Sequence, residues 1–143
     1  MIQIVHVAAY NTLADWEVAY ATAHINKPLW HKNPGRFGTA TVAASTDPIT
    51  TMGGTRVLPD VALADLRPQD SAMLILPGND IWNTEEFVPW TDKAREFLAA
   101  GVPVAAICGA TGGLAMAGLL DDRAHTSNAA EFLAGTGYAG GDL

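Results

Sequence analysis

The chain has 143 residues, of which 49% are hydrophobic, and a formal net charge of −7 at pH 7. This length and composition predict one globular domain with an apolar core and exclude a disordered chain. The eight Lys and Arg residues are scattered, which argues against a nucleic-acid surface, and no apolar run is long enough to cross a bilayer.

The location follows from two further features. The first seven residues carry neither a basic segment nor a cleavage site, so we expect no signal peptide. The single cysteine, Cys108, cannot form an internal disulfide, which fits a reducing compartment. We therefore expect a cytoplasmic protein. We also expect its partner to be a small molecule, with no nucleic acid and no membrane.

The N-terminal half predicts strands around one helix. Residues 13–23 have helical spacing with a broad apolar face, and Asn11 or Thr12 is a candidate N-cap. The other predicted elements are strands at residues 2–8 and 37–44 and a hairpin at residues 49–58, closed at Gly53-Gly54.

The C-terminal half repeats the alternation of strands and helices. The strands are expected at residues 73–76, 103–107 and 124–127, and the helices at residues 86–100, 111–117 and 129–134. This order predicts an α/β fold, a mostly parallel sheet covered on both faces, in a single domain over residues 1–143. The glycine-rich end adds no closing strand or helix, so the chain is either complete or C-terminally shortened.

Cys108 lies where a predicted buried strand meets a turn of small residues and a helix. An α/β fold presents a nucleophile on such a strand-to-helix elbow, facing the positive end of the helix. The alternative is that Cys108 is a small buried hydrophobe without chemistry. The run Gly109-Ala110-Thr111-Gly112-Gly113 favours the nucleophile, because packing alone does not require it.

Two other segments should reach the same end of a parallel sheet, where ligands of open α/β folds bind. Glu17 follows the first strand, and a carboxyl group in contact with Cys108 can share a proton with the thiol. Gly78 and Asn79 follow the strand at residues 73–76, and the N–H groups of Gly78 and Gly109 are candidates for an oxyanion site. Glu17 as an ordinary first-turn acid, and Pro77-Gly78 as an ordinary turn, remain open alternatives.

A catalytic base and a substrate wall have weaker candidates. Of the four histidines, His125 is the best placed along the chain to act as a base for Cys108, the alternative being a structural histidine. We expect no metal site, because the histidines lack ligand spacing and one cysteine makes no thiolate cluster. Trp16 and Trp82 flank the proposed site segments and are candidates for a pocket wall.

These segments together resemble the ThiJ/PfpI family of the class I glutamine amidotransferase-like superfamily. The stretch Ala105 to Thr111, with Ala117-Gly118-Leu119-Leu120 and His125-Thr126-Ser127-Asn128, is similar to the elbow block of that family. Leu74-Ile75-Leu76-Pro77-Gly78 resembles its oxyanion strand, and Asp15-Trp16-Glu17 its acidic segment.

The resemblance implies a flavodoxin-like three-layer sandwich, a homodimer, and no cofactor. It implies Cys108 as nucleophile, Glu17 as its acid partner and an oxyanion site at Gly78 and Gly109. Two departures matter, because peptidase-type relatives carry a histidine where this chain has Gly109, and other relatives carry one near Asn128.

Two functions follow from the resemblance. The first is a cysteine-dependent hydrolase, amidase-like or glyoxalase-like, that acts on a small molecule. The second is a non-catalytic stress or redox-sensing protein whose Cys108 is oxidised.

Overall fold

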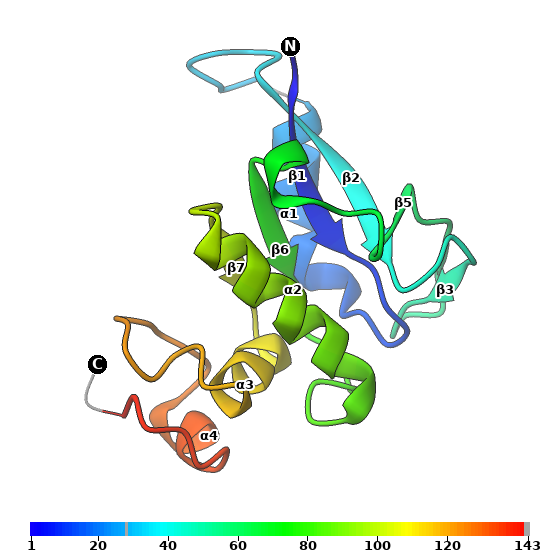
Figure 1. The fold of residues 1–143 in the computed structure, drawn as a ribbon. Coiled ribbons are helices and arrows are strands. Elements are labelled where there is room, and N and C mark those ends of the chain that lie inside the picture. Colours follow the sequence, from blue (N-terminus) through cyan, green and yellow to red (C-terminus); the bar gives the residue numbers. More distant parts are fainter. Residues whose placement is uncertain (28, 142–143) are drawn as a thin grey trace.

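The structure, a computed structural model, describes residues 1–27 and 29–141 (Figure 1). Five parallel strands form one sheet in the order β5-β2-β1-β6-β7. Their bounds are β1 Gln3–Ala8, β2 Phe37–Ala43, β5 Val61–Ala62, β6 Met73–Leu76 and β7 Val104–Ala106. A separate antiparallel pair is formed by β3 Ile49–Thr50 and β4 Arg56–Val57.

The helices alternate with these strands along the chain. Their bounds are α1 Asp15–Asn26, α2 Val88–Ala99, α3 Gly109–Met116 and α4 Ala130–Ala134, with 3-10 turns at Pro68–Asp70 and Glu85–Phe87. Figure 1 shows α1 on one side of the sheet and α2 on the other. No helix in the described ranges is both long and apolar enough to span a membrane.

The strand order sets where a ligand site can form. Apart from the two-residue β5 at the edge, the order β2-β1-β6-β7 is the flavodoxin-like order, with the winding direction changing between β1 and β6. In such sheets the crevice lies beyond the carboxyl ends of the strands at this change of direction. The predicted α/β fold with a mostly parallel sheet is confirmed, and all five strands are parallel.

Side chains alternate between the two faces of the sheet, as a strand period of two requires. Val5, Val7 and Ile75 pack with Val18 of α1 on one face. On the other face, a larger cluster combines strand residues such as Leu74 and Leu76 with the apolar sides of α2 and α3.

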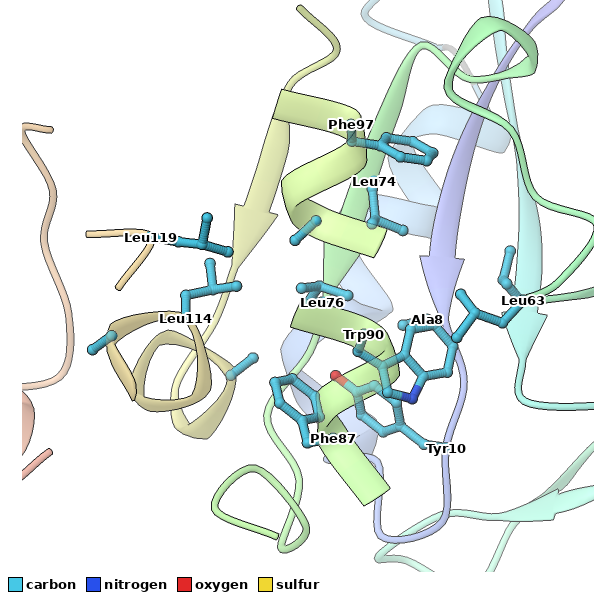
Figure 2. Close-up of a cluster of buried hydrophobic side chains, with 14 of the residues drawn as sticks. Ala8, Tyr10, Leu63, Leu74, Leu76, Phe87, Trp90, Phe97, Leu114 and Leu119 are labelled. Atoms are coloured by element: carbon cyan, nitrogen blue, oxygen red, sulfur yellow. The ribbon is translucent and has the colours of Figure 1, made fainter. Parts of the chain in front are cut away.

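The larger cluster is centred on aromatic rings that connect β1 to α2 (Figure 2). Tyr10, which follows β1, makes edge contacts with Trp90 and Phe87 at ring-centroid distances of 5.1 and 5.7 Å. Trp90, Phe87 and Phe97 are each at most 2% exposed. These contacts fix the segment that connects β1 to α1.

Two local predictions are wrong. Neither Asn11 nor Thr12 caps α1, whose N-cap is Ala14 without a side-chain cap bond. Asn11 Oδ1 accepts instead from the Thr50 N–H, and Thr12 Oγ1 from the Asp80 N–H, so both polar groups hold loops together.

Residues 124–127 form no strand but an extended loop between α3 and α4. Side-chain hydrogen bonds between Ser127 and Thr111 and between His125 and Tyr138 hold this loop in place of a sheet ladder. The helix predicted at residues 86–100 is confirmed as α2, which follows a 3-10 turn and has Pro89 in its first turn.

Candidate active site

The site begins at the turn between β7 and α3. The Ile107 N–H donates to the Leu76 carbonyl at 3.0 Å, which aligns the ends of β7 and β6. The next residue, Cys108, has φ 54° and ψ −124° and is exposed. Residues other than glycine rarely adopt this backbone conformation, and backbone strain of this kind is concentrated at functional sites. The turn therefore presents the thiol to solvent at the N-terminus of α3, as an elbow does.

Contrary to the expectation from the sequence, packing does require small residues after Cys108, because Trp82 lies against them. A Cβ atom at Gly109 would be 2.7 Å from Trp82 Cδ1, and one at Gly112 would be 2.7 Å from Trp82 Cζ3. Trp82 also contacts Phe132 of α4, with ring centroids 5.2 Å apart, and lines a cavity of about 440 Å³ beside α2. Trp82 is thus next to the elbow, whereas Trp16 is 63% exposed on α1.

Glu17 and Cys108 approach Gly78 together. Glu17 Oε2 accepts a hydrogen bond of 2.5 Å from the Gly78 N–H. A Cβ atom at Gly78 would be 2.6 Å from both carboxylate oxygens of Glu17 and 2.9 Å from Cys108 Cβ. The structure thus brings these three predicted residues together and leaves no space there for a side chain.

The Gly78 N–H is not available to an oxyanion in this arrangement, because it donates to Glu17. The Asn79 side chain is buried and faces backbone, with Nδ2 donating to Pro77 at 3.1 Å and Oδ1 accepting from the Ile81 N–H at 3.0 Å. Asn79 thus shapes the turn with its side chain. Within residues 1–27 and 29–141, the backbone N–H groups of Asn79 and Gly109 donate to no protein acceptor. The two residues are also close, since a Cβ atom at Gly109 would lie 3.0 Å from the Asn79 carbonyl oxygen.

His125 does not face Cys108. Its Nδ1 lies 2.8 Å from the Arg123 carbonyl and its Nε2 lies 3.1 Å from the Tyr138 hydroxyl. Its ring also packs edge-on against Tyr138, with centroids 5.4 Å apart. Both ring nitrogens are used to hold the loop, which leaves His125 in a structural position.

The residue that does reach the thiol is Asn128, whose role the sequence did not indicate. Asn128 Nδ2 donates to Cys108 Sγ at 3.4 Å, a hydrogen bond that connects residues 20 positions apart. Its place in the sequence, near where some relatives carry a histidine, was the one available signal.

Acid–base properties around the site follow from burial and hydrogen bonds. Burial raises the pKa of the Tyr10 phenol far above its ordinary value, and its hydroxyl donates to the Pro77 carbonyl next to Gly78. Hydrogen bonds from the Thr51 hydroxyl and the Gly53 N–H lower the pKa of Asp15, which ties the β3–β4 hairpin to α1. Across the described ranges, no group of three or more His, Cys, Asp or Glu residues is placed to hold a metal ion.

An α/β sheet with this order, a strained cysteine at the elbow and a carboxylate across Gly78 defines a class I glutamine amidotransferase-like fold. A profile of the DJ-1/PfpI family matches residues 3–139, so the chain belongs to the DJ-1/PfpI family. The family that the sequence motifs resembled is thereby confirmed.

Individual relatives agree with this assignment. The chain is 35% identical over 130 residues to the "uncharacterized protease YoaZ" of Bacillus subtilis (strain 168), covering 90% of this chain and 62% of the relative. It is 31% identical over 120 residues to the "uncharacterized protease YdeA" of the same organism, covering 80% of this chain and 54% of the relative. The chain thus spans less than two thirds of the length of either relative.

Solved structures show the same fold. A thiJ/pfpI family protein from Bacillus anthracis superposes with a TM-score of 0.84 at 37% identity, covering 99% of this chain and 69% of that one. A DJ-1 superfamily protein from Agrobacterium tumefaciens superposes with a TM-score of 0.83 at 28% identity, covering 97% of this chain and 71% of that one.

Proposed function

We propose that the chain is the cysteine-bearing domain of an enzyme that acts on the carbonyl group of a small molecule, in a hydrolase-, amidase- or glyoxalase-like reaction. The single observation that carries this proposal is Cys108, exposed and strained at the N-terminus of α3, with the Glu17 carboxylate across Gly78. Two Bacillus subtilis relatives carry protease in their names, which supports hydrolysis as the reaction class.

Each residue has a defined part in the proposed reaction. The Cys108 sulfur attacks the carbonyl carbon and forms a C–S bond, while the thiol proton passes to Oε1 of Glu17, since Oε2 already accepts from Gly78. The carbonyl electron pair moves to oxygen, where the N–H groups of Asn79 and Gly109 stabilise it. In the hydrolase form the oxyanion collapses, the leaving group departs with its bonding pair, and water then cleaves the thioester.

Turnover of a panel of small esters, amides and α-oxoaldehydes tests the proposal. Cys108→Ser should abolish turnover of any substrate that the wild-type protein consumes, and mass spectrometry should find the acyl group on Cys108. Unchanged turnover in Cys108→Ser would exclude Cys108 as the nucleophile.

A second candidate is a redox-sensing protein in which Cys108 is oxidised. The observation that favours it is the hydrogen-bond donor at the thiol, which is an amide and not a base. The Asn128 amide and the N-terminus of α3 would stabilise a sulfinate. Mass spectrometry after mild peroxide distinguishes the two, because a Cys108 that gains no oxygen excludes this function.

We also propose that the protein is a cytoplasmic homodimer. Trp16 and Tyr20 are 63% and 90% exposed on consecutive turns of α1, on a stripe that continues to Ala23 and carries no charge. Exposed apolar stripes of this kind mark interfaces, and two copies can cover each other's stripe. Light scattering of the wild type and of Tyr20→Lys tests it, because a monomeric wild type would exclude the dimer.

A further inference from the structure

The loop between α3 and α4 is hydrogen-bonded to the elbow at two neighbouring residues. Thr111 Oγ1 donates its proton to the Cys108 carbonyl at 2.6 Å. Since that proton is used, Ser127 is the donor in the 2.5 Å hydrogen bond between the Ser127 and Thr111 hydroxyls. One residue further, Asn128 reaches the Cys108 sulfur. The loop is therefore connected to Cys108 twice: to its backbone carbonyl through Thr111, and to its thiol through Asn128.

The loop is fixed to the segment after α4 as well. His125 Nε2 lies 3.1 Å from the Tyr138 hydroxyl, and Asp121 Oδ1 accepts from the Ala139 N–H at 3.0 Å. Asn128 thus lies at the end of a segment that three other side chains, those of Asp121, His125 and Ser127, anchor to other parts of the chain. An amide held in this way needs little reordering to keep its hydrogen bond to sulfur.

The chemistry of an amide differs from that of a histidine at the same place. The amide N–H₂ group donates hydrogen bonds at every ordinary pH, but it neither takes nor gives up a proton. A donor to a thiolate favours the charged form of the sulfur. The ionisable group that the structure brings to the same point is Glu17, from α1.

We propose that Asn128 is a positioning residue that holds the Cys108 sulfur by a hydrogen bond that does not titrate and that favours the thiolate over the thiol. Glu17 remains the group that exchanges a proton with the thiol in the proposed reaction. The positioning role of Asn128 does not rest on the proposed function.

Alkylation of Cys108 by iodoacetamide, followed against pH, tests the positioning role. Asn128→Asp keeps the shape but replaces the donor with a carboxylate, so alkylation at neutral pH should fall about tenfold or more and the midpoint of the pH–rate curve should move upward. Asn33→Asp, an exposed asparagine given the same change in charge, is the matched control and should leave the curve in place. Equal curves for the two variants would overturn the positioning role.

Two further variants separate positioning from folding. Ser127→Ala removes the anchor beside Asn128 and should shift the curve in the same direction but less, with little change in melting temperature. Asn128→Gln, which keeps the amide on a longer side chain, should restore part of the lost rate. An Asn128→Ala protein that melts like the wild type and alkylates at the wild-type rate would also overturn the role.

Acylation of Cys108 by p-nitrophenyl acetate tests the proposed function separately. Normal dependence of alkylation on Asn128 with no acylation by this ester would sustain the positioning role and refute the proposed hydrolase.

Discussion

Both backbone polar groups of Gly78, its N–H and its carbonyl, are hydrogen-bonded to the start of α1, and Glu17 is the side chain involved. The Gly78 N–H donates to Glu17 Oε2 at 2.5 Å, and the Gly78 carbonyl accepts from the Ala14 N–H at 2.9 Å. The end of β6 and the first turn of α1 are thereby locked in one arrangement. Because β7 pairs with β6, this lock also fixes the carboxylate of Glu17 relative to the thiol of Cys108.

Gly78→Ala should disrupt this arrangement. The added Cβ would lie 2.6 Å from both carboxylate oxygens of Glu17 and 2.9 Å from Cys108 Cβ, so at least one of the two must move. We expect a loss of about 1–3 kcal/mol in the free energy of unfolding, as for other overpacked sites, together with a changed rate of Cys108 alkylation. Urea unfolding and iodoacetamide kinetics measure the two effects.

Gly135→Ala is the matched control for that substitution. Its added Cβ would meet backbone atoms at 3.5 and 3.6 Å, which is ordinary contact. Stability should change by less than about 1 kcal/mol, and the alkylation rate should not change. If both variants behave alike, the crowding at Gly78 is not what holds the site.

The backbone strain at Cys108 should be measurable as a difference in the free energy of unfolding between two variants. At a φ of 54°, a residue with a Cβ atom has a strained backbone conformation, whereas glycine adopts this φ without strain. Cys108→Gly should therefore unfold at higher urea than Cys108→Ala, by about 1 kcal/mol in free energy. Both variants lack the thiol, so their difference reports the backbone alone. A Cys108→Ala protein as stable as Cys108→Gly would mean that the elbow is relaxed.

His6 should make the protein less stable in mild acid. Burial lowers the pKa of its ring, and the carboxylates of Asp70 and Asp60 oppose this shift only in part. Its Nδ1 lies 2.8 Å from the Ser71 hydroxyl, which itself donates to the Met73 carbonyl. As pH falls below the ordinary value of 6.5, the unfolded chain takes up a proton that the folded chain does not, so stability drops.

The measurement is urea unfolding of the wild type and His6→Asn at a series of pH values. The free energy of unfolding of the wild type, relative to that of His6→Asn, should decrease as pH is lowered below 6.5, by at most about 1.4 kcal/mol per pH unit. The decrease should level off below the pKa of His6 in the folded protein. A difference that does not vary with pH would show that His6 titrates alike in both states.

Much of the fold could be predicted because its signals are local. The apolar run of β6 ends at Pro77-Gly78, and the hairpin turn at Gly53-Gly54 has the residues that such a turn needs. The two-residue β5 was not predicted, since so short a segment carries no periodicity of its own. Residues 124–127 looked like a strand, but the bonds that place them come from Thr111 and Tyr138, which no local pattern contains.

The residues of the candidate site also fall into those that the sequence could predict and those that it could not. Cys108 was predictable because the elbow is a local sequence of strand, small residues and helix. Glu17 was predictable because it lies in the first turn of the helix that follows the first strand. Asn128 was not, since its contact with the sulfur depends on how the loop after α3 returns to the elbow. His125 failed as a base for the same reason, because chain position does not determine which way a ring faces.

Tyr10 should make the protein lose stability at high pH. Its phenol is buried against Trp90 and Phe87, and this burial raises its pKa, while a hydrogen bond from Asn79 opposes the shift. Above pH 10.0, the ordinary pKa of the phenol, the unfolded chain releases the phenol proton and the folded chain keeps it, so the folded state loses stability as pH rises.

Tyr10→Phe removes this titration together with the hydrogen bond to Pro77. We expect the variant to be less stable at neutral pH by about 1 kcal/mol, because Asn79 Nδ2 still satisfies the Pro77 carbonyl. Above pH 10.0 the gap should close and then reverse, with a slope of at most about 1.4 kcal/mol per pH unit. Urea unfolding of both proteins at alkaline pH measures it, and a gap that stays constant would mean that Tyr10 ionises in the folded protein.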